Sequence, residues 1–250
     1  SLRWRWVDRA VARELLGFSG WAYVISVCDR LRPGLDAFVL GWLRGSPATG
    51  VYNLGARPVW MMADVVYAAI GLQLLPAFTR MRESGDQERL HTAFLLITRL
   101  SAWLAMAAAG AALALGPSFL RWWVPEHAAE AAPVLLCLAL PLGLQLAQVP
   151  AVHLLYAVAQ HRALALVQSG GMILNLALSL VLSRWLGIVG AALGTAVEII
   201  LLHGFVMPLL LARKAGIPAA AFMWGGQMVP LLASTAACSL PALAVWRWMP

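Results

Sequence analysis

Four charged residues interrupt an apolar stretch near the amino terminus. Asp29, Arg30, Arg32 and Asp36 lie within residues 15–43, where almost all other side chains are apolar or small. A charged side chain at bilayer depth is costly, and such residues usually face a polar interior rather than lipid. If this stretch crosses a membrane, the cluster indicates that the chain binds or moves a polar species within the bilayer.

Helical spacing divides this cluster into two parts. Residues three, four or seven apart share a helix face, so Asp29, Arg32 and Asp36 are expected on one face, with Arg32 paired to carboxylates. Arg30 points about 100° away, given a period of 3.6 residues. Pro33–Gly34 stands in the middle of the cluster and predicts a kink or an unwound turn there.

The next apolar stretch repeats the pattern, because Asn53, Arg57 and Asp64 share a helix face and Pro58 is a further distorter. Arginine offers a planar, bidentate set of donors that suits phosphate or carboxylate ligands. A carboxylate inside a membrane can carry a proton or an ion. The residues predicted to bind substrate are Arg30, Arg32, Arg57 and Asn53, and those predicted to couple protons or ions are Asp36, Asp64 and Glu198. The alternative is that the charges form buried salt bridges that only fix helix packing.

Composition places the whole chain in a membrane. It is 62% hydrophobic and 12% charged, whereas soluble domains average about 25% charged residues. Apolar stretches long enough to span a bilayer occur seven times: 15–43, 51–79, 92–116, 133–158, 164–184, 190–211 and 220–246. We therefore predict an all-α polytopic membrane protein. Its parts are a cytoplasmic amphipathic segment (1–14), a six-helix transmembrane lobe (15–211), and a connecting loop with one additional transmembrane helix (212–250).

The distribution of basic and aromatic residues predicts the orientation. Most Lys and Arg residues fall before the first span and in the loops at 80–91, 162 and 213–214, and Trp residues gather at the opposite ends of the spans. The positive-inside rule places the amino terminus of this chain in the cytoplasm. The net charge of +7 is thus interpreted as a topology signal, and nucleic acid is not expected as a partner.

Neither enzyme chemistry nor metal binding is indicated. The three cysteines are widely spaced without partner histidines, which predicts neither a zinc site nor a disulfide framework. No HExxH, GxSxG, Walker A or GxGxxG motif occurs. No catalytic residue and no cofactor is therefore expected. The glycines of Gly41–Gly45 and Gly190–Gly194 match the small-xxx-small pattern and predict close helix approach.

Several stretches, taken in their order along the chain, resemble the carboxy-terminal lobe of the lipid-linked oligosaccharide flippases. These flippases belong to the multidrug/oligosaccharidyl-lipid/polysaccharide exporter superfamily. The stretches are Leu35–Gly41, Thr49–Arg57, Leu75–Phe78, Tyr156–Gln160, Asn175–Leu176 and Gly187–Ala196, and together they cover about residues 30–200. The resemblance implies a helical transporter of two similar lobes. It also implies that a polyprenyl-diphosphate-linked oligosaccharide crosses the bacterial inner membrane by alternating access through a central cationic cavity.

This sequence departs from the family pattern in having about half the expected spans. We therefore expect membrane lipids and an amino-terminal lobe of the same protein as further partners. Two alternatives stay open at this point. One is a cation-coupled multidrug or metabolite exporter of the same fold, which would favour acidic and aromatic cavity residues. The other is a membrane-embedded transferase acting on lipid-linked sugars, for which Glu126, His127 and Glu130 are the only candidate cluster.

Overall fold

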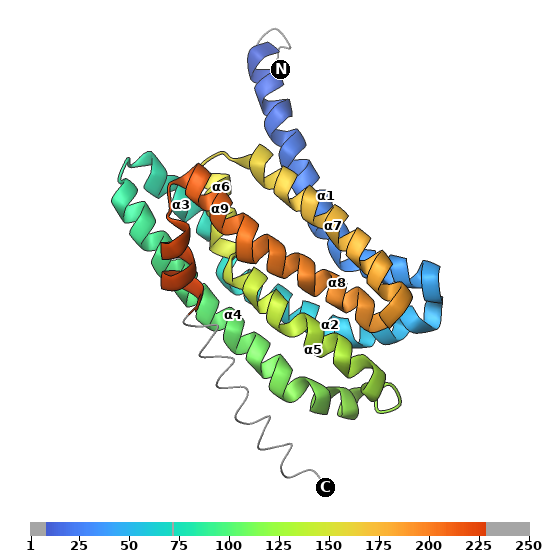
Figure 1. Cartoon of the computed structure of the whole chain (residues 1–250). Coiled ribbons are helices and arrows are strands. Elements are labelled where there is room, and N and C mark those ends of the chain that lie inside the picture. The colour runs from blue at the N-terminus through green and yellow to red at the C-terminus, as the bar shows by residue number, and fades with distance from the viewer. Residues whose placement is uncertain (1–8, 72, 229–250) are drawn as a thin grey trace, which may run out of the picture.

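The computed structural model describes residues 9–71 and 73–228, and in these ranges every regular element is a helix (Figure 1). In chain order the elements are α1 (Arg9–Arg44), α2 (Ser46–Gly71), α3 (Leu74–Glu83), α4 (Gln87–Trp123), α5 (Ala128–Ala147), α6 (Val149–Ala157), α7 (His161–Leu186), α8 (Ile188–Leu201), the π-helix η2 (Leu202–Val206), α9 (Met207–Ala215) and the π-helix η3 (Ala221–Met228). The prediction of an all-α polytopic membrane protein is confirmed.

Five helical units within the described residues are long and apolar enough to cross a membrane: Ser46–Glu83, Gln87–Trp123, Ala128–Ala157, His161–Leu186 and Ile188–Ala215. The helix α1 is 36 residues long, but its charged residues make it more polar than these five. Residues 9–14, predicted to form a separate surface segment, continue directly into α1. Of the predicted span 220–246, residues 229–246 lie outside the described part of the chain.

Two prolines follow irregular positions of the helices, although not where the sequence predicted them. Pro150 follows the turn at Gln148 that separates α5 from α6, and Pro208 follows the π-helix η2 at the start of α9. In contrast, α1 continues through Pro33–Gly34, and α2 continues through Pro58, without interruption. Of the predicted kink or unwound turn, the unwound turn is not found in α1 or α2, because each proline removes only one backbone hydrogen bond and the surrounding helix persists.

The unit α5–α6 forms the centre of the bundle. It contacts α2, α4 and α8, while α7 packs against both α1 and α8 (Figure 1). In the most apolar window of Ala128–Ala157, 61% of residues are buried, against 29% in Ser46–Glu83. Large apolar side chains on the outer helices remain exposed, among them Phe38, Trp185 and Phe205. This arrangement suits a bundle whose outer surface meets lipid, not water.

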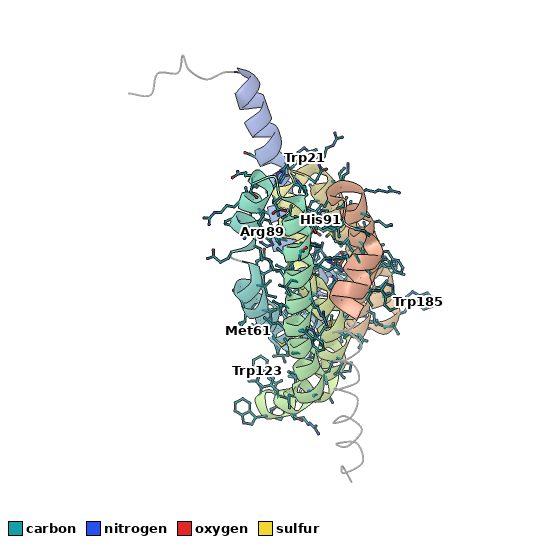
Figure 2. The ribbon with its side chains drawn as sticks, turned by 90° about the vertical axis from the view of Figure 1, so that its left-hand side faces the viewer. Trp21, Met61, Arg89, His91, Trp123 and Trp185 are labelled. Atoms are coloured by element: carbon teal, nitrogen blue, oxygen red, sulfur yellow. The ribbon has the colours of Figure 1, made fainter. Side chains whose placement is uncertain are left out.

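The two ends of the bundle differ in chemistry. Figure 2 shows Arg89 and His91, near the start of α4, at the end opposite to Trp123, where α4 finishes. Trp122 is 80% exposed and lies beside it in sequence. Tryptophan favours the boundary between hydrocarbon and water. The start of α4 thus places charged residues at one end of the bundle, and its finish places two exposed tryptophans at the other.

Glycine allows α7 and α8 to approach closely. A Cβ atom at Gly190 would lie 2.2 Å from the Leu182 carbonyl oxygen, and one at Gly194 would lie 2.7 Å from the Ser179 backbone nitrogen. The small-xxx-small prediction is therefore confirmed at Gly190–Gly194. It is wrong at Gly41–Gly45. Gly41 is exposed, whereas Gly45 forms the turn between α1 and α2 with φ +83°.

Replacing Gly190 with alanine is expected to destabilise the protein by about 1–3 kcal/mol, since the new methyl group would overlap backbone that cannot rotate away. Gly170→Ala on α7 is a matched control, because nothing lies within 4 Å of its added Cβ and alanine favours a helix. Thermal unfolding of both variants in detergent measures the difference. Equal midpoints for the two variants would contradict the close approach of α7 and α8.

Candidate functional site

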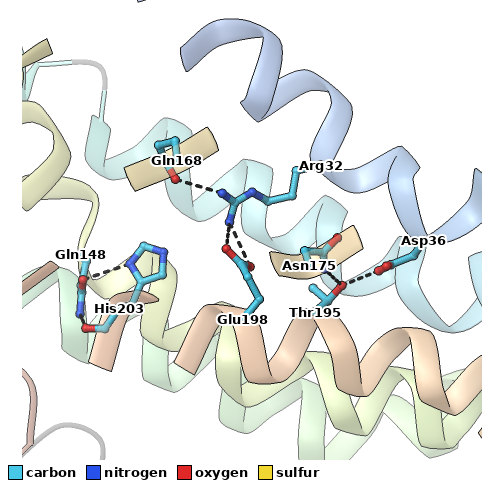
Figure 3. A network of polar contacts seen from close by, with 8 residues as sticks. All are labelled: Arg32, Asp36, Gln148, Gln168, Asn175, Thr195, Glu198 and His203. Carbon is cyan, nitrogen blue, oxygen red and sulfur yellow. Dashed lines mark hydrogen bonds and ion pairs between the residues drawn. The ribbon is translucent and has the colours of Figure 1, made fainter. Parts of the chain in front are cut away.

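Arg32 forms a buried ion pair with Glu198. Its Nη1 atom donates to both carboxylate oxygens of Glu198, at 3.0 and 3.2 Å, and its Nη2 atom donates to Gln168 Oε1 at 3.0 Å (Figure 3). Arg32 is 4% exposed and Glu198 is fully buried. The three residues come from α1, α7 and α8, so this contact joins helices that are distant in sequence.

The predicted pairing of Arg32 along its own helix is therefore wrong. Arg32 to Glu198 is the single ion pair found within the part of the chain that the structure describes. Asp29 is exposed, and Asp36 accepts hydrogen bonds from hydroxyl groups instead. Arg32 faces α7 and α8, where a carboxylate on a facing helix offers both oxygens to its planar guanidinium group.

Asp36 is the centre of a second buried network. Its carboxylate accepts from Tyr52 Oη at 2.6 Å, from Ser179 Oγ at 2.6 Å and from Thr195 Oγ1 at 2.5 Å. Asn175 Nδ2 in turn donates to Thr195 Oγ1 at 2.6 Å (Figure 3), while its Oδ1 atom is buried without a hydrogen-bond partner. One carboxylate thereby connects α1, α2, α7 and α8. Carboxylate, hydroxyl and amide oxygens can accommodate a proton or a hard cation.

A third polar cluster joins the turn between α5 and α6 to the π-helices η2 and η3. Gln148, between α5 and α6, donates from Nε2 to the His203 carbonyl oxygen at 2.6 Å and to Gln227 Oε1 at 3.0 Å. His203, in η2, places Nδ1 3.0 Å from Gln148 Oε1 (Figure 3). Because that amide oxygen can only accept, Nδ1 is the donor, and Nε2 of the neutral ring keeps its lone pair. π-Helical turns of this kind are frequent at functional sites.

A cavity of about 340 Å³ lies among these networks. Its walls come from α1, α2, α5, α6, α7 and η2. The polar residues that line it are Asp29, Arg32, Trp60, Asp64, Tyr67, Gln145, Gln168 and His203, and the apolar ones are Ala63, Leu142, Leu146, Val149 and Val152. We refer to this space as the lobe cavity. Within the described residues, no group of three or more His, Cys, Asp or Glu side chains is placed to hold a metal ion.

Some of the predicted site residues lie inside the bundle or line its cavity, and the others lie on its outer surface. Arg32 and Asp64 line the lobe cavity. Glu198 lies behind Arg32, and Asp36 is buried in its own network. The structure thus brings Arg32, Asp36 and Glu198 into the interior of the bundle, whereas Asp64 is exposed where it lines the lobe cavity.

The remaining predicted residues lie outside that interior. Arg30 on α1, and Asn53 and Arg57 on α2, are exposed and do not line the lobe cavity. Arg32 points inward, whereas Arg30 and Arg57 do not, so only one of the three arginines predicted to bind substrate lines the lobe cavity. With a rise of 1.5 Å per residue, Arg30 and Arg57 both lie roughly 20 Å along their helices from the turn at Gly45.

Sequence reasoning missed most of the partners of these charges. Gln168, Asn175 and Ser179 are polar residues within an apolar helix, and their spacing of seven and four places them on one face. That spacing was the available signal. Tyr52 and Thr195 carried no such signal, because an isolated hydroxyl in an apolar helix is common and can bond its own backbone.

Comparison with known proteins gives one match. Residues 1–121 match the model of a family described as polysaccharide biosynthesis protein. The matched segment contains α1, α2, α3 and most of α4. It therefore includes the exposed residues Arg30 and Arg57 as well as the buried residues Arg32 and Asp36. No curated protein and no solved structure matches the chain.

Proposed function

We propose that this chain, a polysaccharide exporter-type membrane protein by its family match, flips a lipid-linked oligosaccharide across the membrane by alternating access. The observation that carries the proposal is the exposure of Arg30 and Arg57, each roughly 20 Å along its helix from the turn at Gly45, on two packed helices. An arginine facing hydrocarbon is costly, so this face of α1 and α2 must meet polar surroundings.

The proposed ligand of this face is the diphosphate group of the lipid carrier. A guanidinium group binds phosphate oxygens through two parallel hydrogen bonds, and Asn53 lies one helical turn before Arg57 on the same exposed face. Arg32 is excluded from this role, because Glu198 and Gln168 already occupy its Nη atoms. The polyprenyl tail would remain in the lipid while the sugars cross the polar surroundings.

Asp36 is the proposed coupling residue. Protonation of its carboxylate, or binding of a cation beside it, would change the acceptor that holds Tyr52, Ser179 and Thr195. Those hydroxyls belong to three other helices, so such a change would alter how α1 packs against α2, α7 and α8. Asp64, exposed at the lobe cavity, and Glu198, held by Arg32, are proposed as secondary coupling groups.

The membrane location, the orientation and the partners of the chain are also proposals. The protein would lie in a bacterial inner membrane with the amino terminus of this chain in the cytoplasm, and would act as a transporter, not an enzyme. An amino-terminal lobe and membrane lipids would be its partners. The loop residues Glu126, His127 and Glu130 are exposed, and none of the hydrogen bonds or ion pairs found within the described ranges joins their side chains.

Replacing Arg57 or Arg30 with alanine is expected to lower the flipping rate at least about tenfold, because each change removes a charge-assisted hydrogen bond to phosphate. The assay measures translocation of a fluorescent lipid-linked oligosaccharide in proteoliposomes. Arg80→Ala is the matched control, since Arg80 is an exposed arginine at the end of α3. The elution profile should stay that of folded protein in all three variants. Flipping at the normal rate by both Arg30→Ala and Arg57→Ala would remove the basis of the proposal.

A second candidate has one observation in its favour. The lobe cavity carries two carboxylates, Asp29 and Asp64, together with the aromatic rings of Trp60 and Tyr67. Acidic and aromatic side chains suit an organic cation, as expected of a cation-coupled multidrug or metabolite exporter. Transport of a cationic dye such as ethidium, with no flipping of the lipid-linked substrate, would favour this candidate.

A further inference from the structure

We infer that the lobe cavity binds a small aliphatic dication, such as an alkane diamine whose two amino groups are protonated. Asp29 on α1 and Asp64 on α2 each bind one ammonium group, and the apolar walls of the cavity cover the carbon chain. Such a ligand is smaller than a cationic dye such as ethidium and carries one more charge. Binding of this dication does not rest on the proposed flipping function.

The charge of the accessible lining favours a cation. Asp29 and Asp64 both line the cavity, and both are exposed. Neither forms an ion pair within the described ranges, although Arg30 follows Asp29 directly in the sequence. Arg32 also lines the cavity, but its charge is balanced by Glu198 at 3.0 Å. The lining thus carries two uncompensated negative charges, and a ligand with two positive charges neutralises both.

The two carboxylates come from neighbouring helices and lie at similar levels. Counted from the turn at Gly45, Asp29 is 16 residues back along α1 and Asp64 is 19 residues forward along α2. With a rise of 1.5 Å per residue, the two levels differ by about 5 Å. Packed helices such as α1 and α2 are about 8–10 Å apart. Side chains that reach one cavity from these positions are separated by roughly 5–10 Å, which a chain of a few carbon atoms can span.

The other walls of the cavity suit ammonium groups and methylene groups. On α2, Trp60 lies one turn before Asp64 and Tyr67 lies one turn after it, and both aromatic side chains line the cavity. An ammonium group is attracted to the face of an aromatic ring. Leu142 and Leu146 of α5 add an aliphatic wall. A carbon chain that packs against this wall is removed from water, which stabilises the bound state.

Other classes of ligand fit this lining less well. An anion would be repelled by the two carboxylates, and a neutral ligand would leave both charges uncompensated. A calcium or magnesium ion takes about six or more oxygen ligands, whereas no group of three or more His, Cys, Asp or Glu side chains in the described part of the chain is placed to hold a metal ion. Ligand sites range from about 300 to 1,000 Å³, so a cavity of about 340 Å³ favours a compact ligand.

The test is equilibrium binding to the whole protein in nanodiscs of phosphatidylcholine, measured by isothermal titration calorimetry at neutral pH. This lipid carries no net charge, and empty nanodiscs correct for binding of the probes to lipid. The probes are the alkane diamines from propane-1,3-diamine to octane-1,8-diamine, with n-butylamine, butane-1,4-diol and magnesium chloride as comparisons. We expect saturable binding of the diamines with an optimum chain length. Butylamine lacks the second charge and should bind at least about tenfold more weakly than the best diamine.

Two variants test the carboxylates directly. Asp29→Asn and Asp64→Asn each remove one charge from an exposed side chain and keep its size, so both proteins should stay folded. Each change should weaken binding of the best diamine about tenfold, and the preference for that diamine over butylamine should disappear. The matched controls are Glu88→Gln and Glu130→Gln, which change exposed carboxylates outside the cavity and should leave diamine binding unchanged.

Three outcomes would overturn the inference: no diamine binds saturably; butylamine, butanediol or magnesium binds as tightly as the best diamine; or Asp29→Asn and Asp64→Asn bind diamines as the controls do. Arg30→Ala and Arg57→Ala, which test the proposed function, change residues outside the cavity and should retain diamine binding. Normal flipping by these two variants would therefore remove the proposed function and leave the dication site. Absence of diamine binding would remove the dication site alone.

Discussion

Replacing Arg32 with methionine is expected to destabilise the protein by about 3–5 kcal/mol, because Glu198 would stay buried with its charge unpaired. Glu198→Leu should destabilise it by a similar amount, since Arg32 would then lose its carboxylate. The double variant Arg32→Met/Glu198→Leu removes both charges and should recover most of the loss, as replacement of buried ion pairs by apolar residues often does.

Thermal unfolding in detergent, followed by size-exclusion elution, measures the three variants. The double-mutant cycle isolates the coupling between the two side chains. If Arg32→Met unfolds at the same temperature as the unmodified protein, the ion pair contributes nothing, and the inward placement of Arg32 is wrong. This prediction also explains why loss of transport in an Arg32 variant would not identify a substrate contact.

Replacing Asp36 with alanine is expected to have the second large effect. The change would leave the hydroxyls of Tyr52, Ser179 and Thr195 buried without their acceptor, and each such loss costs about 1–3 kcal/mol. Asp36→Asn keeps the size and one acceptor oxygen but cannot carry a charge. It should therefore retain the fold while flipping becomes at least about tenfold slower and insensitive to an imposed ion gradient.

The measurement is flipping in proteoliposomes with and without a proton or sodium gradient. Glu130→Gln is the matched control, since Glu130 is an exposed carboxylate in the first turn of α5 and should respond to the gradient normally. An Asp36→Asn variant that responds to the gradient as the unmodified protein does would exclude Asp36 as the coupling residue. Only the stability part of the prediction would then remain.

The sequence predicted the helices well, because long apolar stretches have one stable form in a membrane. It also predicted that Arg32 and Asp36 belong to a polar interior. It did not predict their partners. Glu198 was recognised as an intramembrane carboxylate, but its pairing with Arg32 depends on α8 lying beside α1, and the helical period carries no information on the contacts between helices. The same holds for Thr195, which becomes significant only once α8 is placed.

Arg30 and Arg32 also show that the helical period does not predict contacts between helices. Helical phase correctly separated Arg30 from Arg32, and the structure leaves Arg30 exposed while Arg32 is buried. Phase alone could not say which of the two faces meets the bundle. That choice depends on Glu198 on α8 and Gln168 on α7, which bind Arg32 and leave Arg30 outside.

The distance along the chain between Arg32 and its partners has a consequence for biogenesis. Translation produces α1 long before Gln168 and Glu198 exist, so the first helix leaves the ribosome with its charges unsatisfied. Such a helix partitions poorly into lipid by itself. Stable insertion of α1 is therefore expected to depend on α7 and α8, which carry the partners of Arg32.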